Sequence, residues 1–117
     1  MKLAIFGSRT LVTIDLSEYI PDGVNEIVSG GARGIDQAAR AFAHEHGLLL
    51  TEFLPEYARY GRAAPLKRNQ SIADYADEGI AFWDGKSRGT ADTIRRFERL
   101  GKRMTVILIS PGQPSRA

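Results

Sequence analysis

The sequence contains no cysteine, no long apolar run and no marked excess of charge of one sign. The lack of cysteine excludes disulfide bonds, thiolate metal sites and cysteine nucleophiles, and it fits a reducing compartment. A run of about eighteen apolar residues, which a membrane-spanning helix needs, is absent, and no signal-peptide pattern follows Met1. We therefore expect a cytoplasmic protein that has no membrane partner.

The charge balance is close to neutral, because 16 basic and 14 acidic side chains leave a formal net charge of +2. Such a balance argues against tight non-specific binding to nucleic acid. Two histidines, His44 and His46, lie near the end of a predicted helix, where contact with the helix dipole accounts for both. We therefore expect no metal site and no cofactor.

The length of 117 residues is that of one domain, which we assign to residues 1–110. Residues 111–117 have little to bury, and we expect a disordered tail there. Apolar runs alternate with segments of helical periodicity, which predicts an α/β fold with a parallel sheet and helices on both faces. The expected strands cover residues 2–6, 26–29, 48–53, 79–83 and 104–109, and the expected helices cover residues 15–20, 35–46, 66–76 and 91–100.

Several details of this pattern can be checked in a structure. Asp15 is expected to cap the first short helix, and the last helix is expected to bury Ile94, Phe97 and Leu100. Residues 55–65 are expected to form an irregular surface loop. For the five strands we predict three layers and the order 3-2-1-4-5, with the ligand outside the carboxyl ends of the strands.

Glycine-bearing turns follow the first, second and fourth predicted strands, at residues 7–9, 30–36 and 84–90. All three turns fall on the carboxyl edge of the predicted sheet. Glycine lets the backbone approach a ligand closely, and Ser87 or Thr90 can supply a hydroxyl beside the unpaired amides at the start of the last helix. This combination favours a phosphate-bearing ligand, although the last turn read alone equally fits an ordinary strand-to-helix loop capped by Thr90.

Two familiar phosphate-binding motifs do not fit. Gly85, Lys86 and Ser87 resemble the end of a P-loop, but the glycine required five residues earlier is replaced by Ile80. A G-x-G-x-x-G dinucleotide fingerprint is also missing from the turns. The sequence therefore argues against a Walker-type nucleotidase and against a nicotinamide dehydrogenase.

Two motifs together carry a family resemblance: SGGARGID at residues 29–36 and FWDGKSRGT at residues 82–90. With Arg68, Asn69 and Asp77, they make the chain similar to the SLOG superfamily of Rossmann-like proteins, which bind nucleotides or nucleotide derivatives. The small stand-alone branch related to YspA is the most similar, through residue 109. The resemblance implies a Rossmann-like fold and a nucleotide-like ligand at the carboxyl edge.

The chain also resembles, more distantly, the LOG phosphoribohydrolases, which cleave the base from a nucleoside monophosphate. Arg68, Asp77 and the Gly89-Thr90 pair match the pattern of that group, but Thr93 stands where its glutamate is expected. Asp92 is adjacent, yet a shift of one residue turns a helical side chain by about 100°. Whether this chain is an enzyme, an N-glycosidic-bond hydrolase acting on a nucleotide, is therefore left open.

The candidate site residues come from the turns and from the third helix. As catalytic candidates we take Arg68 and Asp84, of which Asp84 is either an acid-base or ribose-binding group or a turn residue that stabilises its own loop. Trp83 either stacks a base or belongs to the core or a dimer contact. The candidates for phosphate or ligand binding are Gly7, Ser8, Arg9, Gly30, Gly31, Arg33, Gly34, Asp36, Asn69, Gly85, Ser87, Gly89 and Thr90.

Three functions follow as expectations. The first is a sensor or nucleotide-processing protein that binds a phosphorylated nucleoside derivative, the second is the hydrolase, and the third is a nucleic-acid-binding module. The third depends on a local basic patch formed by Arg59, Arg62, Lys67 and Arg68. We also expect a homodimer that covers Tyr57 and Tyr60 through residues 55–65 and the third helix.

Overall fold

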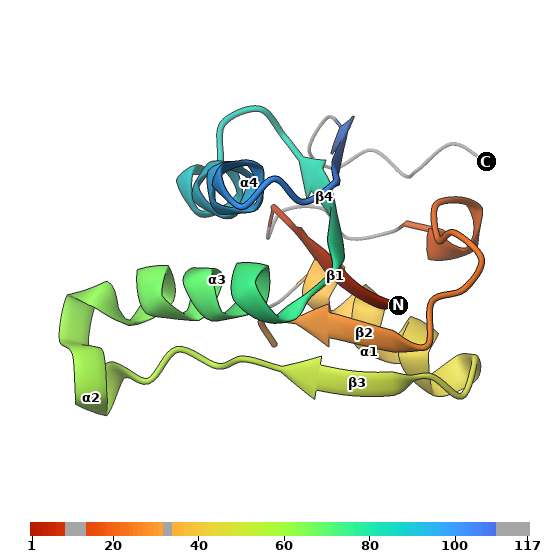
Figure 1. Cartoon of the computed structure of the whole chain (residues 1–117), viewed down its shortest axis with the longest axis horizontal. Coiled ribbons are helices and arrows are strands. Elements are labelled where there is room, and N and C mark those ends of the chain that lie inside the picture. Colours follow the sequence, from red (N-terminus) through yellow and green to blue (C-terminus); the bar gives the residue numbers. More distant parts are fainter. Residues whose placement is uncertain (9–13, 32–33, 110–117) are drawn as a thin grey trace.

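The computed structural model describes residues 1–8, 14–31 and 34–109 (Figure 1). These residues form a five-stranded parallel sheet with the order β3-β2-β1-β4-β5, as predicted. The strands are β1 (Lys2–Gly7), β2 (Glu26–Ser29), β3 (Leu49–Glu52), β4 (Glu78–Trp83) and β5 (Met104–Leu108). The expected tail lies outside the described residues.

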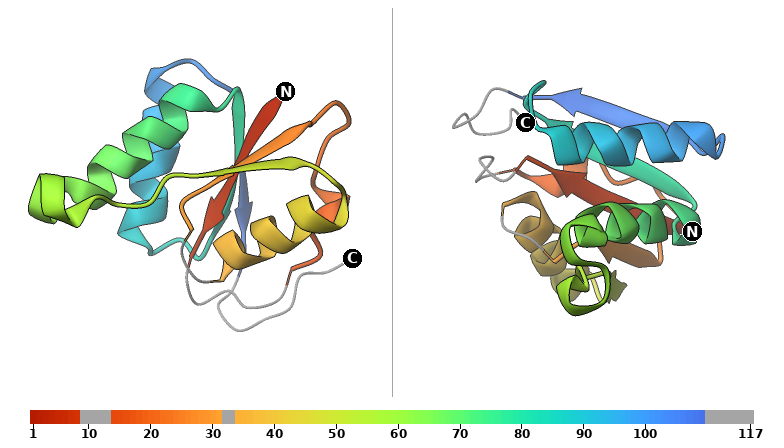
Figure 2. Two further views of the ribbon diagram at one scale, coloured as in Figure 1. Left: turned by 90° about the horizontal axis from the view of Figure 1, so that it is seen from below. Right: turned by 90° about the vertical axis from the view of Figure 1, so that its left-hand side faces the viewer.

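Helices cover both faces of the sheet and give it three layers (Figure 2). One face carries α1 (Ile35–Glu45) and the short 3-10 helix η1 (Leu16–Glu18). The other face carries α3 (Ala64–Tyr75) and α4 (Arg88–Arg99). The structure therefore has the three-layer Rossmann-like architecture that the sequence predicts.

The central strand β1 is buried on both faces, which explains its compact apolar sequence. Alternate side chains point to opposite faces of a strand, so Leu3 and Ile5 pack beneath α1 while Ala4 and Phe6 pack beneath α3 and α4. The ring of Phe6 stacks on that of Phe97 with a centroid distance of 5.9 Å. This packing holds the carboxyl end of β1, where the candidate site lies, against α3 and α4.

Three local predictions need correction or refinement. Residues 55–65 are not an irregular loop, because they form α2 (Tyr57–Tyr60), the 3-10 turn η2 (Gly61–Ala63) and the first residues of α3. Pro65 is favourable in the first turn of α3, because the backbone amides of that turn have no partner within the helix and the φ angle of proline is already helical. Leu100 is 45% exposed rather than buried, because α4 ends at Arg99.

Asp15 does cap the first short helix, since its Oδ1 accepts a hydrogen bond of 3.1 Å from the Ser17 amide. That helix is only the single turn η1 and is shorter than the expected range of residues 15–20.

No helix in the described part of the chain is long and apolar enough to cross a membrane.

Candidate functional site

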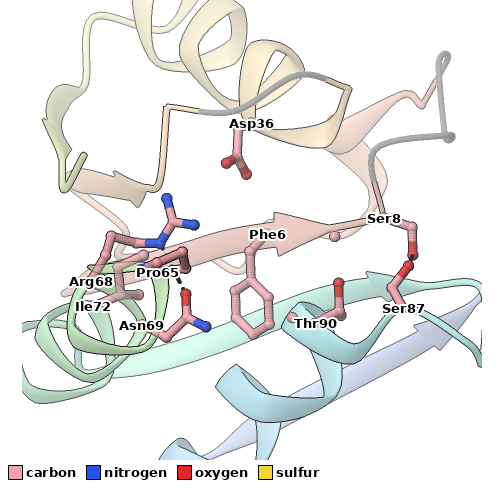
Figure 3. A pocket seen from close by; sticks show the side chains of 11 residues that line it. Phe6, Ser8, Asp36, Pro65, Arg68, Asn69, Ile72, Ser87 and Thr90 are labelled. Carbon is pink, nitrogen blue, oxygen red and sulfur yellow. Dashed lines mark hydrogen bonds between the residues drawn. The ribbon is translucent and has the colours of Figure 1, made fainter. Parts of the chain in front are cut away.

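A cavity of about 330 Å³ opens at the carboxyl ends of β1 and β4, between α1, α3 and the start of α4 (Figure 3). The strand order reverses between β1 and β4, since β2 and β3 lie to one side of β1 while β4 and β5 lie to the other. Ligands of open parallel sheets bind at this kind of switch point. The cavity therefore occupies the position that the fold alone designates for a ligand.

Eight of the sequence-predicted residues line this cavity together. They come from four separate segments of the chain, namely the end of β1, helix α1, helix α3 and the start of α4. The eight are Gly7, Ser8, Asp36, Arg68, Asn69, Ser87, Gly89 and Thr90. Residues that lie up to 83 positions apart in the sequence thus line one cavity at the carboxyl edge of the sheet.

The other candidates lie outside the cavity lining. Gly30 sits directly behind Arg68, because a Cβ built on it would lie 2.5 Å from Arg68 Nη1 and 3.2 Å from Asp36 Oδ2. Gly31, Gly34, Asp84 and Gly85 are not among the lining residues. Arg9 and Arg33 fall outside the described residues.

Sequence reasoning missed the apolar part of the lining, which consists of Phe6, Pro65 and Ile72. Helical spacing could have indicated two of them, since Pro65 and Ile72 lie three or four residues from Arg68 and so share its side of α3. Phe6 directly precedes the Gly7 turn. The cavity therefore combines an apolar wall with hydroxyl, amide, guanidinium and carboxylate groups, which is the usual make-up of a small-molecule site.

The loop after β4 is held by a cluster of short polar side chains at the cavity wall. The Asp84 amide donates to Ser8 Oγ at 3.1 Å, and the Oγ atoms of Ser8 and Ser87 are 2.9 Å apart. The Ser8 amide also donates to the Phe82 carbonyl at 3.0 Å, so the end of β1 is fastened to β4. Ser8, which is 1% exposed, therefore joins the first and last glycine turns.

The Asp84 carboxylate stabilises its own loop, which is the second of its two predicted roles. Its Oδ1 accepts hydrogen bonds of 2.8 Å from the amides of Lys86 and Ser87, and its Oδ2 accepts one of 3.1 Å from Ser87 Oγ. The backbone bonds, with that of Ser87 the strongest, lower the pKa of Asp84 to about 2. At neutral pH the group is therefore ionised and has no proton to donate as a general acid.

The first turn of α4 forms one wall of the cavity through Gly89 and Thr90. Ser87 occupies the N-cap position, but its side chain makes no hydrogen bond to the backbone amides of that turn. Thr90, the expected cap, lies inside the helix and is 6% exposed. The start of α4 thus brings backbone amides to the cavity wall, where the helix dipole favours an anion.

Trp83 also holds this loop, because its indole Nε1 donates to the Ser87 carbonyl at 3.0 Å. The side chain is partly buried against the core beneath α3 and α4. These contacts match the core interpretation of Trp83.

On α3, Arg68 ties the helix to the ends of two strands. Its Nη1 donates to the carbonyl of Gly30 at 2.9 Å and to that of Phe53 at 3.5 Å, and its Nε donates to Asn69 Oδ1 at 2.9 Å. These three hydrogen bonds fix the orientation of the guanidinium. In Figure 3 the guanidinium lies below Asp36, which descends from α1 toward it.

Asn69 is oriented from behind by Asp92 on α4, a contact that sequence reasoning did not predict. Asn69 Nδ2 donates to Asp92 Oδ2 at 3.0 Å, and Arg96 Nε donates to the same oxygen at 2.7 Å. Burial alone would raise the pKa of Asp92, but the bonds from Arg96 and Asn69 outweigh it, so the pKa is lowered. Thr93, at the glutamate position of the phosphoribohydrolase pattern, instead bonds back to the Gly89 carbonyl at 3.1 Å.

Asp36 is the buried carboxylate of the cavity, since it is 6% exposed and lies in the first turn of α1. Within the described residues, no three histidine, aspartate or glutamate side chains gather as they would around a metal ion.

We predict that Asp84→Asn lowers the free energy of unfolding at pH 7 by about 1 kcal/mol, because bonds to a charged acceptor are stronger than bonds to a neutral one. The pKa of about 2 in the folded protein lies below the ordinary value of 3.8, so the ionised group stabilises the fold above pH 3.8 and this contribution is lost as the pH falls toward 2. Urea denaturation between pH 7 and pH 2.5 measures the difference between variant and parent.

Asp22→Asn, at an exposed turn, controls for the change in net charge. A difference between Asp84→Asn and the parent that stays constant over the whole pH range would show that the ionised carboxylate does not stabilise the loop.

Comparison of the chain with protein-family models, with curated proteins and with solved structures finds no match. The fold and the cavity define a Rossmann-like α/β protein with a cavity at the switch point of its sheet.

Proposed function

We propose that this chain binds a phosphorylated nucleoside derivative in the cavity between β1 and β4, as a sensor or nucleotide-processing protein. One observation carries the proposal: eight residues predicted from the sequence, including two in the first turn of α4, line a single cavity at the switch point of the sheet. Charge, hydroxyl groups and an apolar wall in one cavity suit a ligand that has both an anionic and a flat apolar part.

The phosphate is assigned to the side of the cavity formed by Ser8, Ser87 and the first turn of α4. Hydroxyl groups and helix amides at this position are donors to an anion, and the dipole of α4 adds attraction. Asp36 and Asn69 are assigned to sugar hydroxyls, because a carboxylate accepts hydrogen bonds from hydroxyl groups and a side-chain amide both donates and accepts them. Phe6, Pro65 and Ile72 offer the apolar surface for a base.

We also propose that the chain is a member of the SLOG superfamily, of the small branch related to YspA. The proposal is supported by the two glycine motifs, by Arg68 and Asn69, and by the strand order 3-2-1-4-5. A cytoplasmic location and a homodimer belong to the same proposal. Tyr57, which is 59% exposed, is the aromatic side chain that pairing would cover, and light scattering that shows a monomer would refute the dimer.

The binding proposal predicts that nucleoside monophosphates stabilise the protein whereas the parent nucleosides do not. Ligand that reaches one hundred times its dissociation constant raises the free energy of unfolding by about 2.7 kcal/mol. Thermal unfolding and calorimetric titration with AMP, GMP, CMP and UMP, each against its nucleoside, measure this. The absence of any stabilisation at millimolar concentrations would contradict the proposal.

The same samples distinguish binding from the alternative N-glycosidic hydrolysis, because hydrolysis releases free base that chromatography detects. Since Asp84 is occupied by its loop, this alternative would use Asp36, the carboxylate that lines the cavity. Nucleotide that stays intact after prolonged incubation would exclude the hydrolase.

A further inference from the structure

The charges of the chain nearly balance in total, but they are unevenly distributed along its sequence. Residues 86–103, which contain α4 and the short segments beside it, have seven basic and two acidic side chains. The rest of the chain has nine basic and twelve acidic side chains. Such an asymmetry indicates a surface that attracts an anionic partner. The nucleotide cavity does not account for it, because none of these seven basic residues lines that cavity.

The outward side of α4 concentrates this positive charge. Three exposed side chains, Arg88, Arg95 and Arg99, form an arginine face on the helix, because they are seven and four residues apart. The opposite side of the helix is buried in the core through Ile94 and Phe97. In the right view of Figure 2, α4 (cyan to blue) runs along the outside of the molecule. At a rise of 1.5 Å per residue, the arginine face is about 16 Å long.

Little negative charge offsets the arginine face. Within the described part of the chain, no carboxylate forms an ion pair with any of its three guanidinium groups. Asp92 is turned toward α3, where it pairs with Arg96 at 2.7 Å and bonds to Asn69 at 3.0 Å. Glu98 is exposed, but successive residues of a helix are turned by about 100°, so it lies to one side of Arg99. The face therefore presents positive charge to the solvent.

The chemistry of the arginine face favours phosphate groups over other anionic surfaces. The exposed positions of α4 carry no apolar or aromatic side chain. A protein interface has such side chains at its centre, a membrane-bound helix inserts them into the bilayer, and single-stranded nucleic acid stacks on them. Guanidinium groups, in contrast, bind phosphate oxygens in pairs. A nucleic acid duplex carries a phosphate about every 3.4 Å on each strand, so several fall within the length of the face.

We propose that the arginine face of α4 binds the phosphate backbone of a nucleic acid duplex without reading its base sequence. Contacts to phosphates position a protein but carry no sequence information. This surface is separate from the nucleotide cavity and from the basic patch predicted at residues 59–68, where Arg59 is already paired with Glu56 at 3.6 Å. Binding of this kind is weak, with a dissociation constant of about 1 to 100 μM at physiological salt, which agrees with the nearly neutral total charge.

Fluorescence anisotropy with labelled DNA and RNA duplexes of about 20 base pairs tests the inference over a range of salt concentrations. Each neutralised phosphate of a DNA duplex contributes about −0.9 to the slope of log K against log salt, so three contacts predict a slope of about −2.7. Arg95→Ala and Arg99→Ala are each expected to reduce the size of this slope by about 0.9 and to weaken binding about tenfold at low salt. Alanine is the best helix former, so both variants keep the fold.

Arg62→Ala is the matched control, because Arg62 is an exposed cation of the other basic patch and lies on η2. It removes the same charge and should leave the slope unchanged. No complex with either duplex at about 20 mM salt would overturn the inference, and so would a loss of slope in Arg62→Ala as large as in Arg95→Ala. Tighter binding to phosphatidylserine vesicles than to either duplex would also overturn it and assign the face to a membrane. AMP titration of Arg95→Ala, expected to match the parent, keeps this outcome separate from the nucleotide proposal.

Discussion

Replacing Arg68 with methionine is expected to lower the affinity for a nucleoside monophosphate about 100-fold, or about 2.7 kcal/mol. The guanidinium lines the cavity, where hydrogen bonds to the carbonyls of Gly30 and Phe53 and to Asn69 Oδ1 hold it in place. Hydrogen bonds between arginine and phosphate are among the strongest that a side chain makes. Methionine keeps the length and the apolar stem of the side chain but removes every donor.

The same substitution should lower the free energy of unfolding by about 2 kcal/mol, because the carbonyls of Gly30 and Phe53 and the amide oxygen of Asn69 each lose a donor. Urea denaturation and calorimetry with AMP measure the two effects separately. Lys67→Met is the control, since Lys67 is adjacent and exposed but does not line the cavity. An Arg68→Met variant that binds AMP as the parent does would contradict the placement of the ligand.

Gly7→Ala is expected to lower the free energy of unfolding by about 3 kcal/mol, because it overpacks a site without free space. A Cβ at this position would lie 2.4 Å from the Phe82 carbonyl oxygen and 2.8 Å from Ile35 Cγ1. The first neighbour is backbone of β4 and also accepts the Ser8 amide, so it cannot move without weakening the sheet. Such a loss is a large part of the stability of a domain of this size.

Gly89→Ala is the matched control for Gly7→Ala, because a Cβ on Gly89 meets no heavy atom within 4 Å. Gly89 lies in the first turn of α4, where alanine is a better helix former by up to about 1 kcal/mol. Chemical denaturation of both variants should show one strongly destabilised and the other unchanged or more stable. A Gly7→Ala variant as stable as the parent would mean that β1 and β4 do not approach so closely.

The sheet could be predicted well because its strands are short apolar runs separated by glycine turns and amphipathic helices. The bounds of β2, Glu26–Ser29, match the prediction, and the strand order follows from right-handed crossovers between parallel strands. The carboxyl-edge rule also predicts that Ser8 and Thr90 lie together, whereas the family resemblance points to Arg68, and all three line the cavity. These successes depend on local patterns that tertiary contacts do not override.

The parts that could not be predicted depend on contacts between distant segments. Nothing local in residues 55–65 shows the helical turns that pack against the start of α3. Asn69 is held by Asp92, which is 23 residues away on another helix. A second hollow, beside the end of β3, likewise appears only when α2 and α3 are placed over that strand.

The central claim is that a phosphorylated ligand binds at the switch point of the sheet. The most direct measurement is a titration of ¹⁵N-labelled protein with AMP, followed through the backbone amide resonances. The account predicts that the largest shifts occur at Ser8, Gly89 and Thr90, around the cavity between β1 and β4. Shifts confined to the opposite edge of the sheet, near Lys2 and Asp77, or no shifts at millimolar AMP, would contradict it.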